Sequence, residues 1–149
     1  MSTITSPRRL AAVRSLRAER LLIVAAATAA SSLVWLVAMA PLGIELSQPG
    51  FGTQPPQALP IWWVAGITVL AGLAGWSALV VIERFTSRPA VVWLAVSLVA
   101  LIVSLGGPTS GEGVTAANRL VLAAMHLTAG AVLIPNFYRS ARRRSEGTR

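Results

Sequence analysis

The chain has 149 residues, of which 54% are hydrophobic and 12% charged, and its formal net charge is +8 at pH 7. Soluble domains hold roughly 45 to 50% apolar and 25% charged residues, and a soluble protein of this size could not bury so much apolar surface. The composition therefore excludes an ordinary soluble domain and predicts a membrane protein. The absence of cysteine excludes disulfides, thiolate nucleophiles and cysteine-based metal sites.

The first twenty residues carry five arginines and no long apolar run. Apolar residues recur at helical spacing among these arginines. This pattern predicts either an interfacial helix that continues into the membrane or a disordered basic tail. In both cases the segment 1–20 is assigned to a basic cytoplasmic tail.

Four apolar segments long enough to cross a bilayer follow this tail. The first, residues 21–40, has no charge and as a helix reaches about 30 Å, the thickness of the hydrocarbon core. The others cover about 59–82, 90–105 and 117–137. The third is short, so it should cross with little tilt or include the two glycines that follow it. None alternates with period two, and a membrane barrel needs at least eight strands, so we expect helices.

The arginines before the first apolar run also resemble the start of a signal peptide. Small residues at 38–40 would supply a cleavage site. However, Pro41 follows them directly, and the run is longer than a typical signal core. A retained helix is therefore the favoured interpretation.

The arginine distribution predicts the orientation of the chain. Twelve of the thirteen arginines lie before the first span, between the second and third, or after the fourth. Cytoplasmic loops of membrane proteins carry more positive residues than the loops on the other side, so both termini are predicted to be cytoplasmic. Residues 139–149 then form a second basic tail. The predicted fold is an all-α, four-helix transmembrane bundle, up-and-down, over residues 21–138. We expect it in the bacterial cytoplasmic membrane, with anionic headgroups rather than nucleic acid against its basic tails.

The two outer connections are rich in glycine and proline. For residues 41–58 this composition argues against regular structure. In the second connection, Ser110 or Thr115 is expected to cap the fourth helix. Tryptophans near the outer ends of the first two spans are expected at the membrane interface; they are Trp35, Trp62 and Trp63.

Arg119 and His126 are the candidates for chemistry. They lie seven positions apart, so on a helix they share a face and are separated by about 10 Å along the axis. In a functional interpretation, Glu45 or Glu112 pairs with Arg119 while His126 relays a proton or contacts a ligand. In a structural interpretation, a neutral His126 makes one hydrogen bond to a neighbouring helix. The structural interpretation is favoured, because one histidine without a second ligand or a buried carboxylate gives little support for catalysis or transport.

Motifs of several membrane chemistries are absent from the sequence. A single histidine cannot supply paired haem ligands, and neither HExxH nor GxxxxGK[ST] occurs. We therefore expect no cofactor, no metal and no catalytic residue. The adjacent Glu83 and Arg84 are interpreted as the polar boundary of the second span.

Three segments carry a resemblance to a known family. They are LAGWSALVVIERF, which ends at Phe85, IVSLGGP at 102–108, and RLVLAAMHLTAGAVLIP at 119–135. Together with the first span, they resemble an uncharacterised family of small four-helix membrane proteins of the actinobacterial type, a domain of unknown function. The resemblance implies four helices and no established activity.

These observations predict a non-enzymatic structural or accessory membrane protein. Its expected protein partner is a second copy of the chain or another membrane protein. The alternative is a small-solute or proton-coupled carrier that uses Arg119 and His126 with an outer acidic residue. A membrane enzyme is disfavoured, because no nucleophile or metal set can be named.

Overall fold

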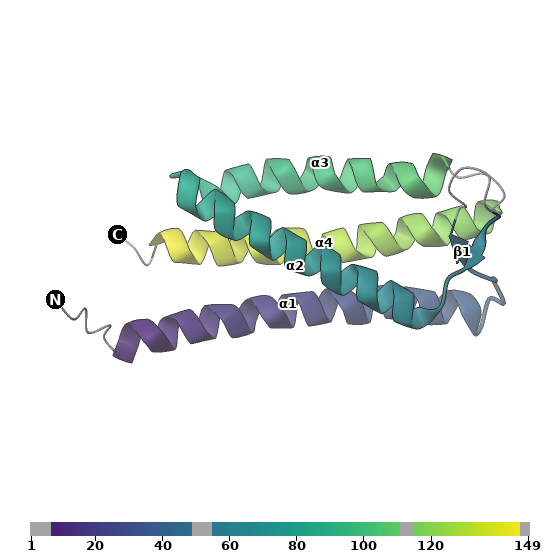
Figure 1. Cartoon of the computed structure of the whole chain (residues 1–149), viewed down its shortest axis with the longest axis horizontal. Coiled ribbons are helices and arrows are strands. Elements are labelled where there is room, and N and C mark those ends of the chain that lie inside the picture. Colours follow the sequence, from purple (N-terminus) through teal and green to yellow (C-terminus); the bar gives the residue numbers. More distant parts are fainter. Residues whose placement is uncertain (1–6, 49–54, 111–114, 147–149) are drawn as a thin grey trace.

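Four helices make up most of the structure. The computed structural model describes residues 7–48, 55–110 and 115–146, with side chains over 15–48, 55–107 and 115–145. The helices are α1 (Pro7–Met39), α2 (Ile61–Phe85), α3 (Pro89–Ser110) and α4 (Ala116–Glu146). They run up and down in turn, so α1 begins and α4 ends at the same end of the bundle (Figure 1). The predicted all-helical, four-helix architecture is confirmed.

All four helices are long and apolar enough to cross a membrane. Large apolar side chains are exposed along each of them, among them Leu22, Leu70, Ile102 and Leu120. Contiguous apolar surface on this scale is unfavourable in water, whereas acyl chains solvate it. The four helices therefore indicate a multi-pass membrane protein.

Two helices extend beyond the predicted spans. α1 begins at Pro7 rather than at residue 21, and α4 continues to Glu146 rather than ending at 137. Pro135 lies inside α4 without ending it. Arg20 and Ser140 are buried against each other, so contact between α1 and α4 continues past the apolar segments and supports the extra turns. α3 includes the two glycines that follow the short third run.

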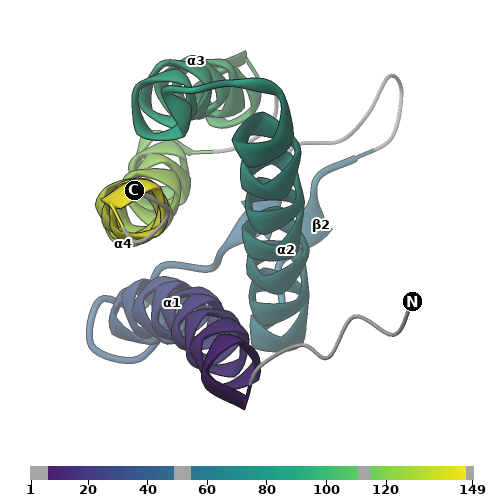
Figure 2. The ribbon, with the colours of Figure 1, turned by 90° about the vertical axis from the view of Figure 1, so that its left-hand side faces the viewer.

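α4 connects the other helices of the bundle. It packs along both α1 and α3, and α1 also packs on α2, whereas α2 has less contact with α3 and α4. Figure 2 looks along the bundle and shows α2 lying across the view while α1 and α4 are seen nearly end on. The first and last helices of the chain are therefore neighbours in space.

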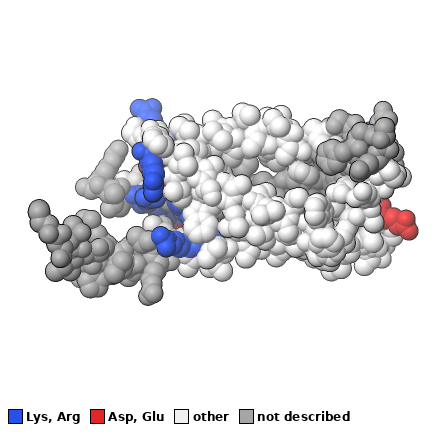
Figure 3. Space-filling view, viewed as in Figure 1, with Lys and Arg blue, Asp and Glu red and all other residues white. Residues whose placement is uncertain are grey.

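The two ends of the bundle differ in charge. Figure 3 shows basic side chains gathered at the end where α1 begins and α4 ends, and an acidic side chain at the opposite end. We call these the basic end and the strand end. Seven exposed arginines belong to the basic end, namely Arg17, Arg84, Arg88, Arg139, Arg142, Arg143 and Arg144.

Two short strands join α1 to α2 at the strand end. β1 (Ser47–Gln48) pairs antiparallel with β2 (Gln57–Ala58). The prediction of no regular structure in this connection is wrong for these residues. Leu46 and Leu59 flank the strands and are buried in the core, and the Leu59 N–H donates to the Leu46 carbonyl oxygen at 2.9 Å. Trp35 Nε1 donates to the Leu59 carbonyl oxygen at 2.8 Å, so the connection is fixed to α1 as well.

Apolar side chains fill the interior near the basic end. Trp93 of α3 meets Phe137 of α4 edge to face, with 5.5 Å between the ring centroids. The Trp93 Nε1 also donates to the Ile134 carbonyl oxygen at 3.1 Å. This tryptophan therefore joins α3 to α4 by both an aromatic contact and a hydrogen bond.

The closest approach of α1 to α2 occurs at Gly72. A Cβ atom at this position would lie 2.9 Å from Val24 Cγ1, which is too close for a normal contact. Val24 is β-branched and buried, so its side chain has little freedom to move away. Glycine at position 72 therefore sets the distance between the two helices.

Gly72→Ala is expected to destabilise the bundle relative to Gly66→Ala. A Cβ atom at Gly66 would meet nothing within 4 Å. Both variants gain the same helix propensity, so the difference between them measures overpacking against Val24, which we expect to be about 1–3 kcal/mol. The measurement is the free energy of unfolding in detergent micelles titrated with sodium dodecyl sulfate. Equal unfolding free energies for the two variants would contradict this packing.

Candidate functional site

The predicted cluster around Arg119 and His126 is spread over several parts of the strand-end half. Arg119 is half-buried in the first turns of α4, and His126 is half-buried further along the same helix. Glu45 is exposed in the connection after α1, and Glu112 lies outside the described residues. The structure thus confirms that Arg119 and His126 share a helix, while Glu45 is exposed to solvent.

His126 bonds within its own helix. Its Nδ1 lies 2.8 Å from the Leu122 carbonyl oxygen, one turn earlier in α4. Because a carbonyl oxygen can only accept, this contact places a proton on Nδ1. The hydrogen bond differs from the predicted interhelical one. Three hydroxyl groups on the other helices behave similarly, since Thr28, Thr68 and Ser77 donate to the carbonyl four residues earlier.

The most concentrated polar contacts lie at the basic end. Arg20 of α1 donates from Nη2 to Glu83 Oε1 of α2 at 2.5 Å and from Nη1 to Oε2 at 3.4 Å. Its Nε donates to Ser140 Oγ of α4 at 3.0 Å. Arg144 of α4 also donates to Glu83 Oε2. We call Arg20, Glu83, Ser140 and Arg144 the arginine–glutamate cluster.

The arginine–glutamate cluster is buried on one side and open on the other. The Arg20 and Glu83 side chains are 4% and 2% exposed, whereas Arg144 is 51% exposed. A buried charge is costly without a partner, and here each one has a partner of opposite sign. The arrangement holds three helices together at one point.

Helical spacing brings these side chains together. Arg20 continues the buried face of α1 that includes Ile23, Val24 and Ala27, at positions three, four and seven residues further on. Glu83 lies one turn after the fully buried Leu79 on α2. Both charged residues therefore lie on faces that the apolar residues already turn inward.

The sequence patterns do not by themselves predict the arginine–glutamate cluster. Glu83 was assigned to a polar boundary with Arg84, but neighbouring residues on a helix point about 100° apart, and Arg84 is exposed. Arg20 was counted among the arginines of a tail. The overlooked signal was the position of each residue on the apolar face of its helix.

A second set of polar contacts, around Asn118, lies at the strand end. The Asn118 side chain is buried; its Nδ2 donates to the Ser47 carbonyl oxygen at 2.6 Å, and its Oδ1 accepts from the Ser47 N–H at 3.3 Å. The Asn118 N–H in turn donates to Thr115 Oγ1 at 3.2 Å, so Thr115 caps α4 as predicted. This contact holds strand β1 on the first turn of α4.

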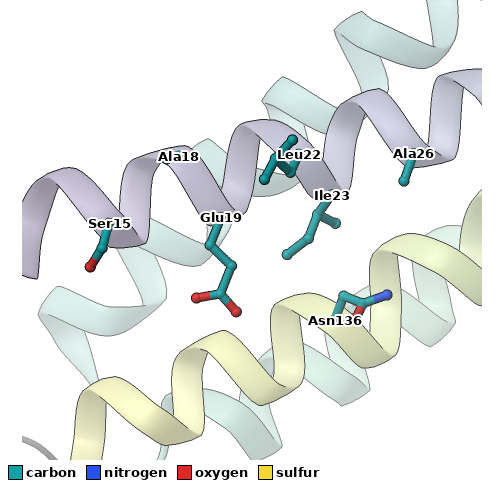
Figure 4. Close-up of a pocket in the computed structure, with 7 residues that line it drawn as sticks. All are labelled: Ser15, Ala18, Glu19, Leu22, Ile23, Ala26 and Asn136. Atoms are coloured by element: carbon teal, nitrogen blue, oxygen red, sulfur yellow. The ribbon is translucent and has the colours of Figure 1, made fainter.

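A shallow groove lies between α1 and α4 near the basic end, with a volume of about 500 Å³. Figure 4 shows Glu19 and Ile23 pointing from α1 toward α4, and Asn136 on the facing side of α4. The lining residues are Ser15, Ala18, Glu19, Leu22, Ile23, Ala26 and Asn136. Neither Arg119 nor His126 lines it. Among the described side chains, no group of three His, Asp or Glu residues is placed to hold a metal ion.

Breaking the buried ion pair should destabilise the bundle strongly. Glu83→Gln leaves Arg20 buried without its counter-charge, and we expect a loss of about 3–5 kcal/mol in unfolding free energy. Arg20→Gln should cost less, because Glu83 keeps Arg144 as a partner. Arg143→Gln is the control, since Arg143 is 65% exposed and its bond to Glu19 should contribute less than about 1 kcal/mol. Equal losses in all three variants would contradict a buried pair.

Comparisons with known proteins place the chain in a family without a known activity. No curated protein and no solved structure matches it. One family model does match, over residues 11–143, which takes in all four helices and the arginine–glutamate cluster except Arg144. The chain belongs to this family, DUF6069, a family of unknown function.

Proposed function

We propose that the chain is a non-enzymatic accessory protein of the bacterial cytoplasmic membrane. The observation that supports this role is how the buried polar side chains are used. Arg20 and Glu83 join helices at the basic end, and Asn118 joins a strand to a helix at the strand end. These contacts stabilise one arrangement of the bundle. An accessory protein needs such a fixed shape to hold or stabilise a second copy of itself or another membrane protein.

The basic end is proposed to face the cytoplasm, with both termini inside. Among the described side chains, eight arginines and two glutamates belong to this end, so its charge is strongly positive. Positive residues are retained on the cytoplasmic side, where anionic headgroups attract them. At the strand end, Trp62 and Trp63 are exposed and meet edge to face, as expected of indoles at the opposite interface.

The carrier alternative receives less support from the site geometry. A relay through His126 needs an imidazole that reaches water or ligand, and the described Nδ1 contact is to a carbonyl of its own helix. Of the two acidic residues considered for a carrier, Glu45 is exposed in the connection between α1 and α2, and Glu112 lies outside the described residues. We therefore favour the accessory role over transport.

Labelling of single cysteines should place the basic end in the cytoplasm. The chain has no cysteine, so each introduced thiol is unique. Ser87, in the α2–α3 connection, and Glu45, at the strand end, are both exposed. In intact cells, a membrane-impermeant maleimide should label the Glu45→Cys variant, and should label the Ser87→Cys variant only after the membrane is permeabilised. The reverse pattern would contradict the proposed orientation.

Proteoliposomes should show no proton flux through the chain. With a pH-sensitive dye inside the vesicles and an imposed pH gradient, the wild type and the His126→Ala variant should both match protein-free vesicles, because the imidazole is held within α4. A proton flux in the wild type that is lost in His126→Ala would overturn the accessory role in favour of a carrier. Crosslinking in native membranes then identifies what the chain assembles with.

A further inference from the structure

We propose that the groove between α1 and α4 binds a phospholipid with an amine headgroup, of the phosphoethanolamine class. This inference rests on the proposed membrane placement and adds a defined lipid site to it. The groove is separate from the arginine–glutamate cluster, because none of the four cluster residues lines it.

The groove is polar at one end and apolar at the other. From Ser15 to Ala26 its α1 wall spans twelve residues, or roughly 16 Å along the helix axis. Ser15 and Glu19 lie toward the basic end, whereas Leu22 and Ala26 lie deeper in the membrane-crossing part of α1. A phospholipid lying along the membrane normal has the same order, with a polar headgroup at the interface and an acyl chain below it.

At the polar end of the groove, the lining residue Glu19 is paired with Arg143 of α4, which does not itself line the groove. Arg143 of α4 donates to Glu19 Oε1 at 3.1 Å, with side chains 65% and 32% exposed. The bond to Glu19 uses one of the five N–H donors that a guanidinium carries, so the same side chain has donors for a phosphate oxygen. The Glu19 carboxylate would face the ammonium group of the same headgroup. A cation and an anion side by side match a headgroup that carries both charges.

The α4 wall adds a polar group to the groove. Asn136 lines it, and its Nδ2 donates to the Val132 carbonyl oxygen of its own helix at 2.7 Å. Nδ2 carries a second N–H, which can donate to an ester oxygen of a bound lipid. Figure 4 shows Asn136 across from Ile23 and Ala26, deeper than Glu19, so it lies at the level below the charged headgroup.

The pair of charges distinguishes this site from general attraction to anionic lipid. The exposed arginines of the basic end attract any phosphate, and an anionic headgroup satisfies them equally well. At the groove, however, a lipid without an ammonium would bring its phosphate beside the Glu19 carboxylate with no positive charge of its own. The groove should therefore select an amine headgroup over phosphoglycerol with the same acyl chains.

Native mass spectrometry of the full chain in detergent tests this selection. The protein is mixed with equal amounts of phosphatidylethanolamine and phosphatidylglycerol of identical acyl chains. We expect the wild type to retain more of the amine lipid, and Glu19→Gln to lower the ratio of the two lipids by about two- to five-fold. Arg143→Gln should weaken binding of both lipids. Ala26→Phe, at an exposed position, should reduce binding of both by filling the acyl part of the groove.

Matched controls make each outcome decisive. Glu45→Gln and Arg88→Gln remove exposed charges away from the groove, and Ala100→Phe adds a ring to an exposed position on α3. Glu45→Gln and Ala100→Phe should bind both lipids as the wild type does, and Arg88→Gln should leave the ratio of the two lipids unchanged. Equal retention of the two lipids by the wild type, or a change in their ratio no larger for Glu19→Gln than for Glu45→Gln, would overturn the proposal. Because the assay needs no orientation or partner, it can fail while the proposed function stands, and the labelling experiment can fail independently of it.

Discussion

The buried contact between Arg20 and Glu83 fixes where three of the four helices meet. In lipid, apolar side chains gain little by exchanging acyl chains for another helix, so association needs polar contacts or very close packing. Both occur here. The ion pair joins α1 to α2, Ser140 extends it to α4, and Gly72 lets the backbone of α2 approach Val24 of α1. The arrangement of the remaining helix follows, because α3 packs on α4 through Trp93.

Polar contacts at the two ends of the bundle join different parts of the chain. At the basic end they join helices directly. At the strand end, Asn118 and Trp35 hold the connection between α1 and α2 instead, through Ser47 and Leu59. The middle of the bundle contains apolar side chains and small residues, and the hydroxyl groups of Thr28 and Thr68 are bonded to their own helices. The bundle is thus fixed at its ends and packed by shape between them.

The number of helices and their apolar surfaces followed from the sequence, because twenty apolar residues in a row have few other stable structures. The positions at which the helices end could not be predicted from the sequence. Residues 139–146 carry arginines typical of a tail, yet Ser140 and Ala141 are buried against the rest of the protein, which no pattern within α4 reveals. The same holds for the site. That Arg119 and His126 lie in one helix follows from local sequence, whereas the contact of Arg20 with Glu83 depends on how two distant helices are placed.

The contact between α1 and α4 also bears on how the protein is made. A ribosome delivers α1 to the membrane first and α4 last, yet these two helices lie side by side. Before α4 enters, Arg20 can pair with Glu83 of α2, but its bond to Ser140 cannot form. The side-by-side contact of the first helix is therefore completed only when the last helix is inserted.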